Sequence, residues 1–211
     1  YGLFYGLSVL WGARKQLFLT FGPWVIVDVF RQPVTTMNLL FFIISTLGIF
    51  LKPMIGKIID TVGEKPVLGF EAVVIGVVCL VYAFAADLLP PGIALLVICG
   101  CYILDQSSSS VGMARATYLR KIAVNPGDIT PTLSLGISID HIASMFLPML
   151  GGLVWTMGGE HGYKYVFMGG AVIAVLNWIA TRRIQVATGP GSGKSAPLSP
   201  PAGAAAADSA E

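Results

Sequence analysis

The chain has 211 residues, of which 55% are apolar and only 11% are charged. A soluble domain carries about 25% charged residues, and an apolar core of this size would need far more polar surface to cover it. The composition therefore excludes an ordinary soluble protein and predicts an integral membrane protein with several spans. The net charge of +2 indicates nothing about nucleic acid, and we expect no nucleic-acid partner.

The first predicted span covers residues 3–27 and carries charge near its middle. Lys15 and Gln16 fall on the same helical arc as Ser8 and Gly12, whereas Arg14 points to the other side. The chain starts inside this apolar run, at Tyr1, without the charged region and cleavage site of a signal peptide. We therefore expect the sequence to be a fragment that lacks what precedes Tyr1.

The second and third predicted spans, residues 36–54 and 67–86, are each about 20 residues long, enough to cross a bilayer. Between them residues 56–65 read GKIIDTVGEK, a polar island that we expect outside the hydrocarbon as a loop. Here Gly56 would allow close approach of a neighbouring helix, and Asp60 would cap the positive N-terminus of one. Gly63 would turn the chain with a positive φ, and Lys65 would add positive charge.

The remaining predicted spans are residues 92–119, 132–157 and 165–180, separated by turns rich in Pro and Gly. Residues 1–184 would then form a bundle of six transmembrane helices. Residues 185–211 are rich in Gly, Pro, Ala and Ser, and we expect a disordered tail.

Lysine and arginine are distributed unequally between the two predicted faces of the membrane. One face would hold Lys52, Lys57, Lys65, Arg120, Lys121, Arg182 and Arg183, and the other only Arg31 and Lys164. By the positive-inside rule, the segments 52–66 and 120–128 and the C-terminus are predicted to be cytoplasmic, in a plasma or bacterial inner membrane.

The spacing G-x-x-x-D-x-x-G-x-K at Gly56, Asp60, Gly63 and Lys65 resembles the signature loop of the major facilitator superfamily. Thr61 and Glu64 stand where the family usually has basic residues, a departure typical of the second copy of that loop. The resemblance covers about residues 1–183 and implies an all-α fold, the C-terminal six-span half of a twelve-span transporter. The partner would be an N-terminal half of six further spans.

Ionisable groups at membrane depth cost at least ~2.5 kcal/mol each, so they usually face a cavity or one another. The resemblance implies that Lys15, Gln16, Asp105 and Ser109 reach a central solute path. Lys15 and Gln16 would bind an anionic or hydrogen-bonding solute, with Asp105 as counter-charge. The alternative is a structural ion pair, Lys15–Asp105 or Arg14–Asp105, that holds two helices together.

The neighbours Asp140 and His141 suggest a proton relay, because imidazole titrates near neutral pH. The alternative, which we favour, is a polar contact between helices. Arg115 would extend to the cytoplasmic interface, and Glu71 would pair with a basic residue of a loop.

Two apparent enzyme motifs are rejected, and we expect no enzymatic activity, cofactor or metal. Residues 188–195 read TGPGSGKS but lack the first glycine of a phosphate-binding loop and the helix that should follow it. Ser138 and His141 lack the G-x-S-x-G turn of a serine hydrolase. The three cysteines, Cys79, Cys99 and Cys101, lie inside apolar runs and are interpreted as buried small side chains.

The sequence as a whole favours a secondary transporter that moves a small polar or charged solute by alternating access, with ion coupling. Within this class, an exporter of drugs or other hydrophobic compounds is the second reading. The alternative class is a six-span membrane protein that does not transport, such as a channel subunit or a scaffold.

Overall fold

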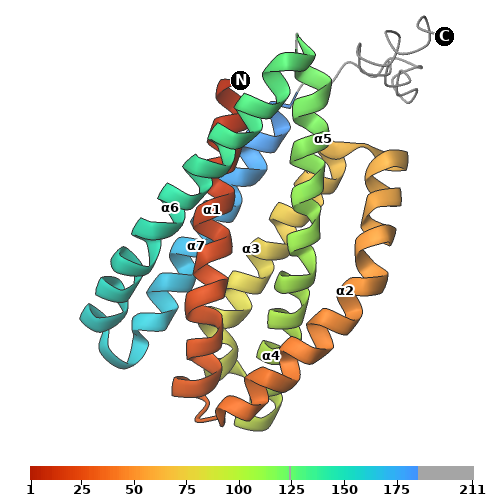
Figure 1. Ribbon diagram of the computed structural model, residues 1–211. Helices are drawn as coiled ribbons and strands as arrows, with labels where there is room; N and C mark the ends of the chain where they lie inside the picture. The colour runs from red at the N-terminus through yellow and green to blue at the C-terminus, as the bar shows by residue number, and fades with distance from the viewer. Residues whose placement is uncertain (124, 185–211) are drawn as a thin grey trace, which may run out of the picture.

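The computed structural model describes residues 1–123 and 125–184, and in these ranges the chain forms helices and no strand (Figure 1). The predicted tail and the stretch 188–195 lie outside the described residues. The helices are α1 (Gly2–Trp24), α2 (Val34–Val62), α3 (Glu64–Leu88), α4 (Pro91–Ser108), α5 (Gly112–Ile122), α6 (Ile129–Met157) and α7 (Gly162–Arg182). A π-helical turn, Val25–Val29, extends α1, and a 3₁₀ turn, Ser109–Val111, joins α4 to α5.

Each predicted span contains helix, and the predicted all-α class is confirmed. Five segments of the described chain are long and apolar enough to cross a bilayer: α2, α3, α4 with α5, α6 and α7. The remaining helix, α1, has 23 residues and carries Arg14 and Lys15 near its middle. This set of helices fits a multi-pass membrane protein.

The polar island between the second and third spans is helical rather than a loop. Helix α2 continues to Val62 and α3 begins at Glu64, so only Gly63 lies outside a helix. Gly63 has the predicted positive φ, +93°, which ends one helix and redirects the chain into the next. No described atom lies within 4 Å of a Cβ placed on Gly56, so the close helix approach predicted there is wrong.

The core of the bundle is the packing of α3 on α7 and of α1 on α6. Three buried aromatic side chains join α1, α3 and α7. The rings of Tyr82 and Phe167 are stacked with centroids 4.4 Å apart, and Phe18 meets both edge-on at 5.6 Å. Such pairs contribute about 0.5–1.5 kcal/mol each beyond the area that they bury.

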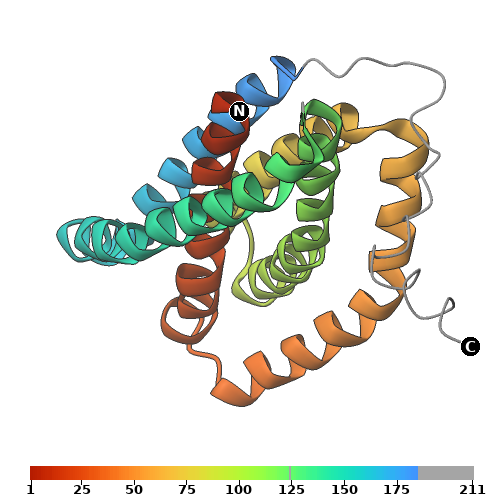
Figure 2. The same ribbon diagram turned by 45° about the horizontal axis from the view of Figure 1, so that its top comes forward.

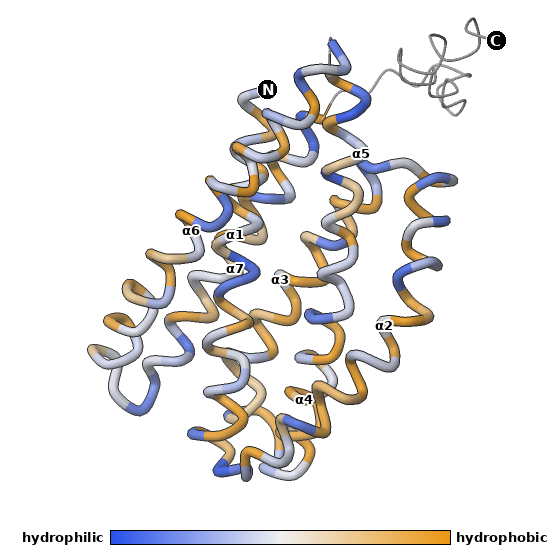
Figure 3. Tube along the Cα trace, in the orientation of Figure 1, coloured by the Kyte–Doolittle hydropathy of each residue, from blue (hydrophilic) through white to orange (hydrophobic). Residues whose placement is uncertain are grey.

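Helix α2 contacts its neighbours less than the other long helices do. Figure 2 shows it running along the outside of the bundle, and only Met37, Leu40 and Ile59 of its residues are buried. Many of its exposed side chains are nevertheless large and apolar, for example Phe42 and Phe50, and α6 likewise exposes apolar side chains such as Met145. Figure 3 shows apolar residues along much of α2. These two helices need lipid or another protein to cover them.

The C-terminal ends of α2, α5 and α7 lie at the same end of the bundle, at the top of Figure 1. This basic end is held together by polar contacts. Lys121 of α5 lies 2.8 Å from Glu64 of α3, and Lys65 donates a hydrogen bond of 3.0 Å to the carbonyl of Ile184 beyond α7. Lys65, Lys121 and Arg182 thus lie at one end of the bundle. The sequence predicted them on one face of the membrane.

We expect Gly12→Ala to lower the stability of the bundle because α1 and α6 cross at this glycine. A Cβ at Gly12 would lie 2.5 Å from Asp140 Oδ1 and would overlap the backbone of Asp140. Such overpacking costs about 1–3 kcal/mol, measured as a lower thermal midpoint in detergent. The matched control is Gly6→Ala on the same helix, where no described atom lies within 4 Å of the added carbon. Equal midpoints for the two variants would contradict this account of the crossing.

Candidate functional site

A buried guanidinium on α1 connects three helices of the bundle. Arg14 donates a hydrogen bond from Nη1 to Glu71 Oε1 of α3, and one of 2.9 Å from Nη2 to Asp105 Oδ1 of α4. All three side chains are almost fully buried, with exposed fractions of 6%, 2% and 5%. One guanidinium thus pairs with two carboxylates in an apolar bundle. Removing the guanidinium would leave two unpaired buried charges, which is strongly destabilising.

The indole of Trp11, one turn before Arg14, packs against two cations. The Cζ atom of Arg14 lies 4.7 Å from the centroid of the indole, and that of Arg115 on α5 lies 3.9 Å from it. Both distances are short enough for a cation–π interaction. Trp11 thereby links the buried Arg14 cluster to the residues around Arg115.

A second ion pair joins α1 to α6. Lys15 Nζ lies 3.0 and 3.1 Å from the two carboxylate oxygens of Asp140. This pair is more open than the Arg14 cluster, with side-chain exposures of 34% and 15%. Arg14 and Lys15 are adjacent in the chain, so α1 carries one ion pair toward α3 and α4 and another toward α6.

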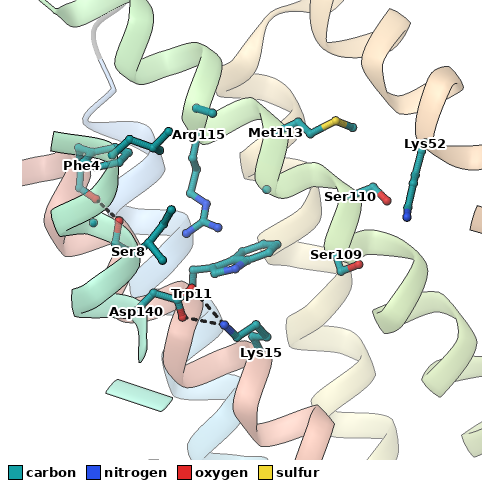
Figure 4. A pocket seen from close by; sticks show the side chains of 15 residues that line it. Phe4, Ser8, Trp11, Lys15, Lys52, Ser109, Ser110, Met113, Arg115 and Asp140 are labelled. Atoms are coloured by element: carbon teal, nitrogen blue, oxygen red, sulfur yellow. Dashed lines mark hydrogen bonds and ion pairs between the residues drawn. The ribbon is translucent and has the colours of Figure 1, made fainter. Parts of the chain in front are cut away.

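The Lys15–Asp140 pair lies at a cavity of about 610 Å³ between α1, α2, α5 and α6 (Figure 4). The polar residues that line it are Ser8, Lys15, Lys52, Ser109, Ser110, Arg115 and Asp140. In Figure 4 the guanidinium of Arg115 lies over Trp11, and the ammonium of Lys52 points down toward Ser109 and Ser110. Most of the lining comes from the halves of the helices nearest the basic end, so the cavity belongs to that side of the bundle.

A further cavity, of about 690 Å³, lies between α2, α3 and α4, and its lining is mostly apolar. Glu71 and Ser107 are among the polar side chains that line it. Within the described part of the chain, Glu71 Oε2 and Ser107 Oγ are buried without a hydrogen-bond partner.

Two of the four predicted solute-binding residues line the first cavity, and the other two do not. Lys15 and Ser109 line the first cavity. Asp105 does not, because it is held by Arg14, and Gln16 donates to the hydroxyl of Thr20 on its own helix at 2.9 Å. Of the two ion pairs left open as alternatives, Lys15–Asp105 is absent, because Lys15 pairs with Asp140. The Arg14–Asp105 pair, left open as an alternative, is present.

Asp140 and His141 are also separated, because they point to different sides of α6. Asp140 faces α1, whereas His141 is exposed and makes no hydrogen bond or ion pair with the described residues. Of the residues at the α2–α3 junction, Lys65 contacts Ile184. Asp60 is exposed and has no hydrogen bond or ion pair to a described residue.

Four residues of the site were missed or misassigned from the sequence. Glu71 was expected to pair with a basic residue of a loop, and Arg115 was expected to extend to the interface; both are in fact turned inward. Lys52 was used only for orientation, and Trp11 was not noticed. In the sequence, the position of Arg14 on the side of its helix opposite the polar face indicated that a second group of charged residues existed.

The described residues include no group of three His, Cys, Asp or Glu side chains placed to hold a metal ion. The thiols of Cys79, Cys99 and Cys101 are free. Comparison of the chain with models of known protein families, with curated proteins and with solved structures finds no match.

We expect Arg14→Met to destabilise the bundle by about 3–5 kcal/mol, because it leaves Glu71 and Asp105 as uncompensated buried charges. The variant in which Glu71→Gln and Asp105→Asn accompany it should recover most of the loss. The free energy of unfolding in mixed micelles measures both effects.

The matched control for Arg14→Met is Arg31→Gln. The Arg31 side chain is 84% exposed and lies 3.8 Å from Asp28, so its removal should change the free energy by about 0–1 kcal/mol. If Arg14→Met were as stable as the Arg31 variant, the buried cluster would not hold the helices together.

Proposed function

We propose that this chain is the C-terminal six-span half of a secondary transporter of the major-facilitator type. The observation that carries the proposal is the cavity between α1, α2, α5 and α6. Charged side chains line it in a bundle that exposes many large apolar side chains elsewhere. Ionisable groups at membrane depth generally mark solute or ion pathways, and this cavity gathers Lys15, Arg115 and Asp140, with Lys52 added from the basic end.

The solute in this proposal is small and polar or charged, and it reaches the cavity from the basic end of the bundle. By the positive-inside rule that end is cytoplasmic, so the structure would represent an inward-open state. The exposed apolar faces of α2 and α6 would be covered by lipid and by a second six-span bundle. Transport would follow from rocking of the two bundles about the central site.

The mostly apolar cavity between α2, α3 and α4 supports the second reading within the same class, an exporter of hydrophobic compounds. It lies beside the buried carboxylate of Glu71, which a cationic hydrophobic compound would pair with. The two readings differ in which cavity the solute occupies. Competition by the solute against labelling of a cysteine at Ser109 or at Ile58 therefore distinguishes them, because these positions line different cavities.

An inward-open resting state predicts that Ser109→Cys reacts with a membrane-impermeant maleimide faster from the basic side than from the opposite side. The background replaces Cys79, Cys99 and Cys101 by alanine. Right-side-out and inside-out vesicles are compared. Thr61→Cys and Gln32→Cys, at opposite ends of the bundle, serve as orientation controls. Equal labelling rates from the two sides would contradict an inward-open resting state, and labelling from neither side would contradict an accessible cavity.

In this proposal, Asp60 helps to close the basic end through contacts made in another conformation. Asp60→Asn should then raise the rate of Ser109→Cys labelling about two- to fivefold, the change expected for ~0.3–1 kcal/mol from a carboxylate at a helix N-terminus. Its thermal midpoint should stay unchanged because Asp60 has no polar partner among the described residues. An unaltered labelling rate and transport rate would remove Asp60 from the mechanism.

A further inference from the structure

The ionisable groups of the Arg14 cluster and the first cavity do not balance. Four are cations, and three are carboxylates: Arg14, Lys15, Lys52 and Arg115 against Glu71, Asp105 and Asp140. Arg14 engages Glu71 and Asp105, and Lys15 engages Asp140. In residues 1–123 and 125–184, neither Arg115 nor Lys52 has a carboxylate partner. The set as a whole carries one positive charge in excess.

The setting of Arg115 leaves its hydrogen-bond donors available. Its guanidinium lies 3.9 Å from the centroid of Trp11, so the ring engages the guanidinium without using its N–H groups. Those N–H groups lie in the guanidinium plane and match the two oxygens of a carboxylate. Within the described chain, Arg115 Nε is buried without a hydrogen-bond partner.

Lys52 and two serines complete the surroundings from the other helices. Lys52 approaches from α2, and its ammonium points toward Ser109 and Ser110 in Figure 4. An ammonium and hydroxyl groups are both hydrogen-bond donors. The cavity therefore offers donors from α2, from the 3₁₀ turn and from α5, while the carboxylate among its described lining residues, Asp140, is already paired with Lys15.

We propose that this cavity binds a small organic anion with one carboxylate, held by Arg115 and attracted by Lys52. A monoanion neutralises the one positive charge that the cavity and the Arg14 cluster together carry in excess, whereas a dianion would overcompensate this joint charge. The proposal rests on the proposed function and deepens it by naming the class of solute. Because α2 is loosely packed, an anion between Lys52 and Arg115 would also draw α2 toward α5.

The test is binding to the full chain in detergent, in chloride-free buffer at pH 7, with lactate and benzoate as probes. Succinate tests whether a second carboxylate is accepted, and inorganic phosphate tests whether the carboxylate itself is required. Glucose and choline serve as neutral and cationic controls. We expect the monocarboxylates to bind more tightly than any other probe. Preferred binding of glucose or choline would overturn the proposal, and so would a lack of binding by every anion. Tighter binding of succinate or phosphate would overturn the monocarboxylate assignment.

Substitutions of Arg115 test whether this residue binds the carboxylate. Arg115→Gln should weaken lactate binding by about tenfold or more, the loss expected for a hydrogen bond to a charged group. Arg115→Lys should recover only part of it, because a lysine keeps the charge without the planar pair of donors. Arg120→Gln is the matched control, since Arg120 is an exposed arginine on the same helix. Equal affinity of the Arg115→Gln variant and the natural protein would overturn the site.

Lys52→Gln keeps the test decisive if Arg115→Gln does not fold, because Lys52 is exposed and unpaired in the described chain. It should weaken lactate binding severalfold without changing the thermal midpoint, and unchanged binding would overturn the role of Lys52. Flux in proteoliposomes that hold this chain together with the second six-span bundle then separates the two proposals. Lactate binding without flux of any probe supports the site and contradicts the transporter. Flux of glucose or choline without any anion supports the transporter and overturns the site.

Discussion

The bundle depends on one buried interaction, the double contact of Arg14 with Glu71 and Asp105. These three side chains come from α1, α3 and α4, and each is at least 94% buried on the side-chain exposures observed. A charge in such an environment is strongly destabilising without its partner, so the three helices are fixed in register relative to one another. The aromatic contacts of Phe18, Tyr82 and Phe167 extend this rigid region to α7.

The same interaction determines what the neighbouring residues can do. Arg14 occupies Glu71 and Asp105, and Lys15 pairs with Asp140 on α6. Arg115 therefore has no carboxylate partner in the part of the chain that the structure describes. Arg115 instead packs on Trp11 and faces the cavity. The surplus of positive charge at the cavity is thus a consequence of how the core charges pair.

The loose packing of α2 contrasts with the rigid packing of α1, α3 and α7. Helix α2 contributes Lys52 to the first cavity and several apolar side chains to the second, so movement of this helix would change both cavities. In the function that we propose, the rigid helices preserve the site while α2 and the covering bundle change position. Their exposed apolar surfaces make such sliding inexpensive in lipid, because lipid replaces protein contacts of similar polarity.

The sequence alone determined the class of the fold, because stretches of about 20 apolar residues have few alternatives to a membrane-spanning helix. It also determined the turn at Gly63, since a positive φ favours glycine. Helical periodicity placed Lys15 on the polar arc of the first span, but only the resemblance to the major facilitator superfamily assigned Lys15 and Ser109 to one solute path. Both residues line the first cavity. The pairing of the charges was decided only by the tertiary structure. Glu71, Asp105 and Asp140 were all possible partners of a cation on α1, and helix packing, which local sequence does not encode, brought Glu71 and Asp105 to Arg14 and Asp140 to Lys15.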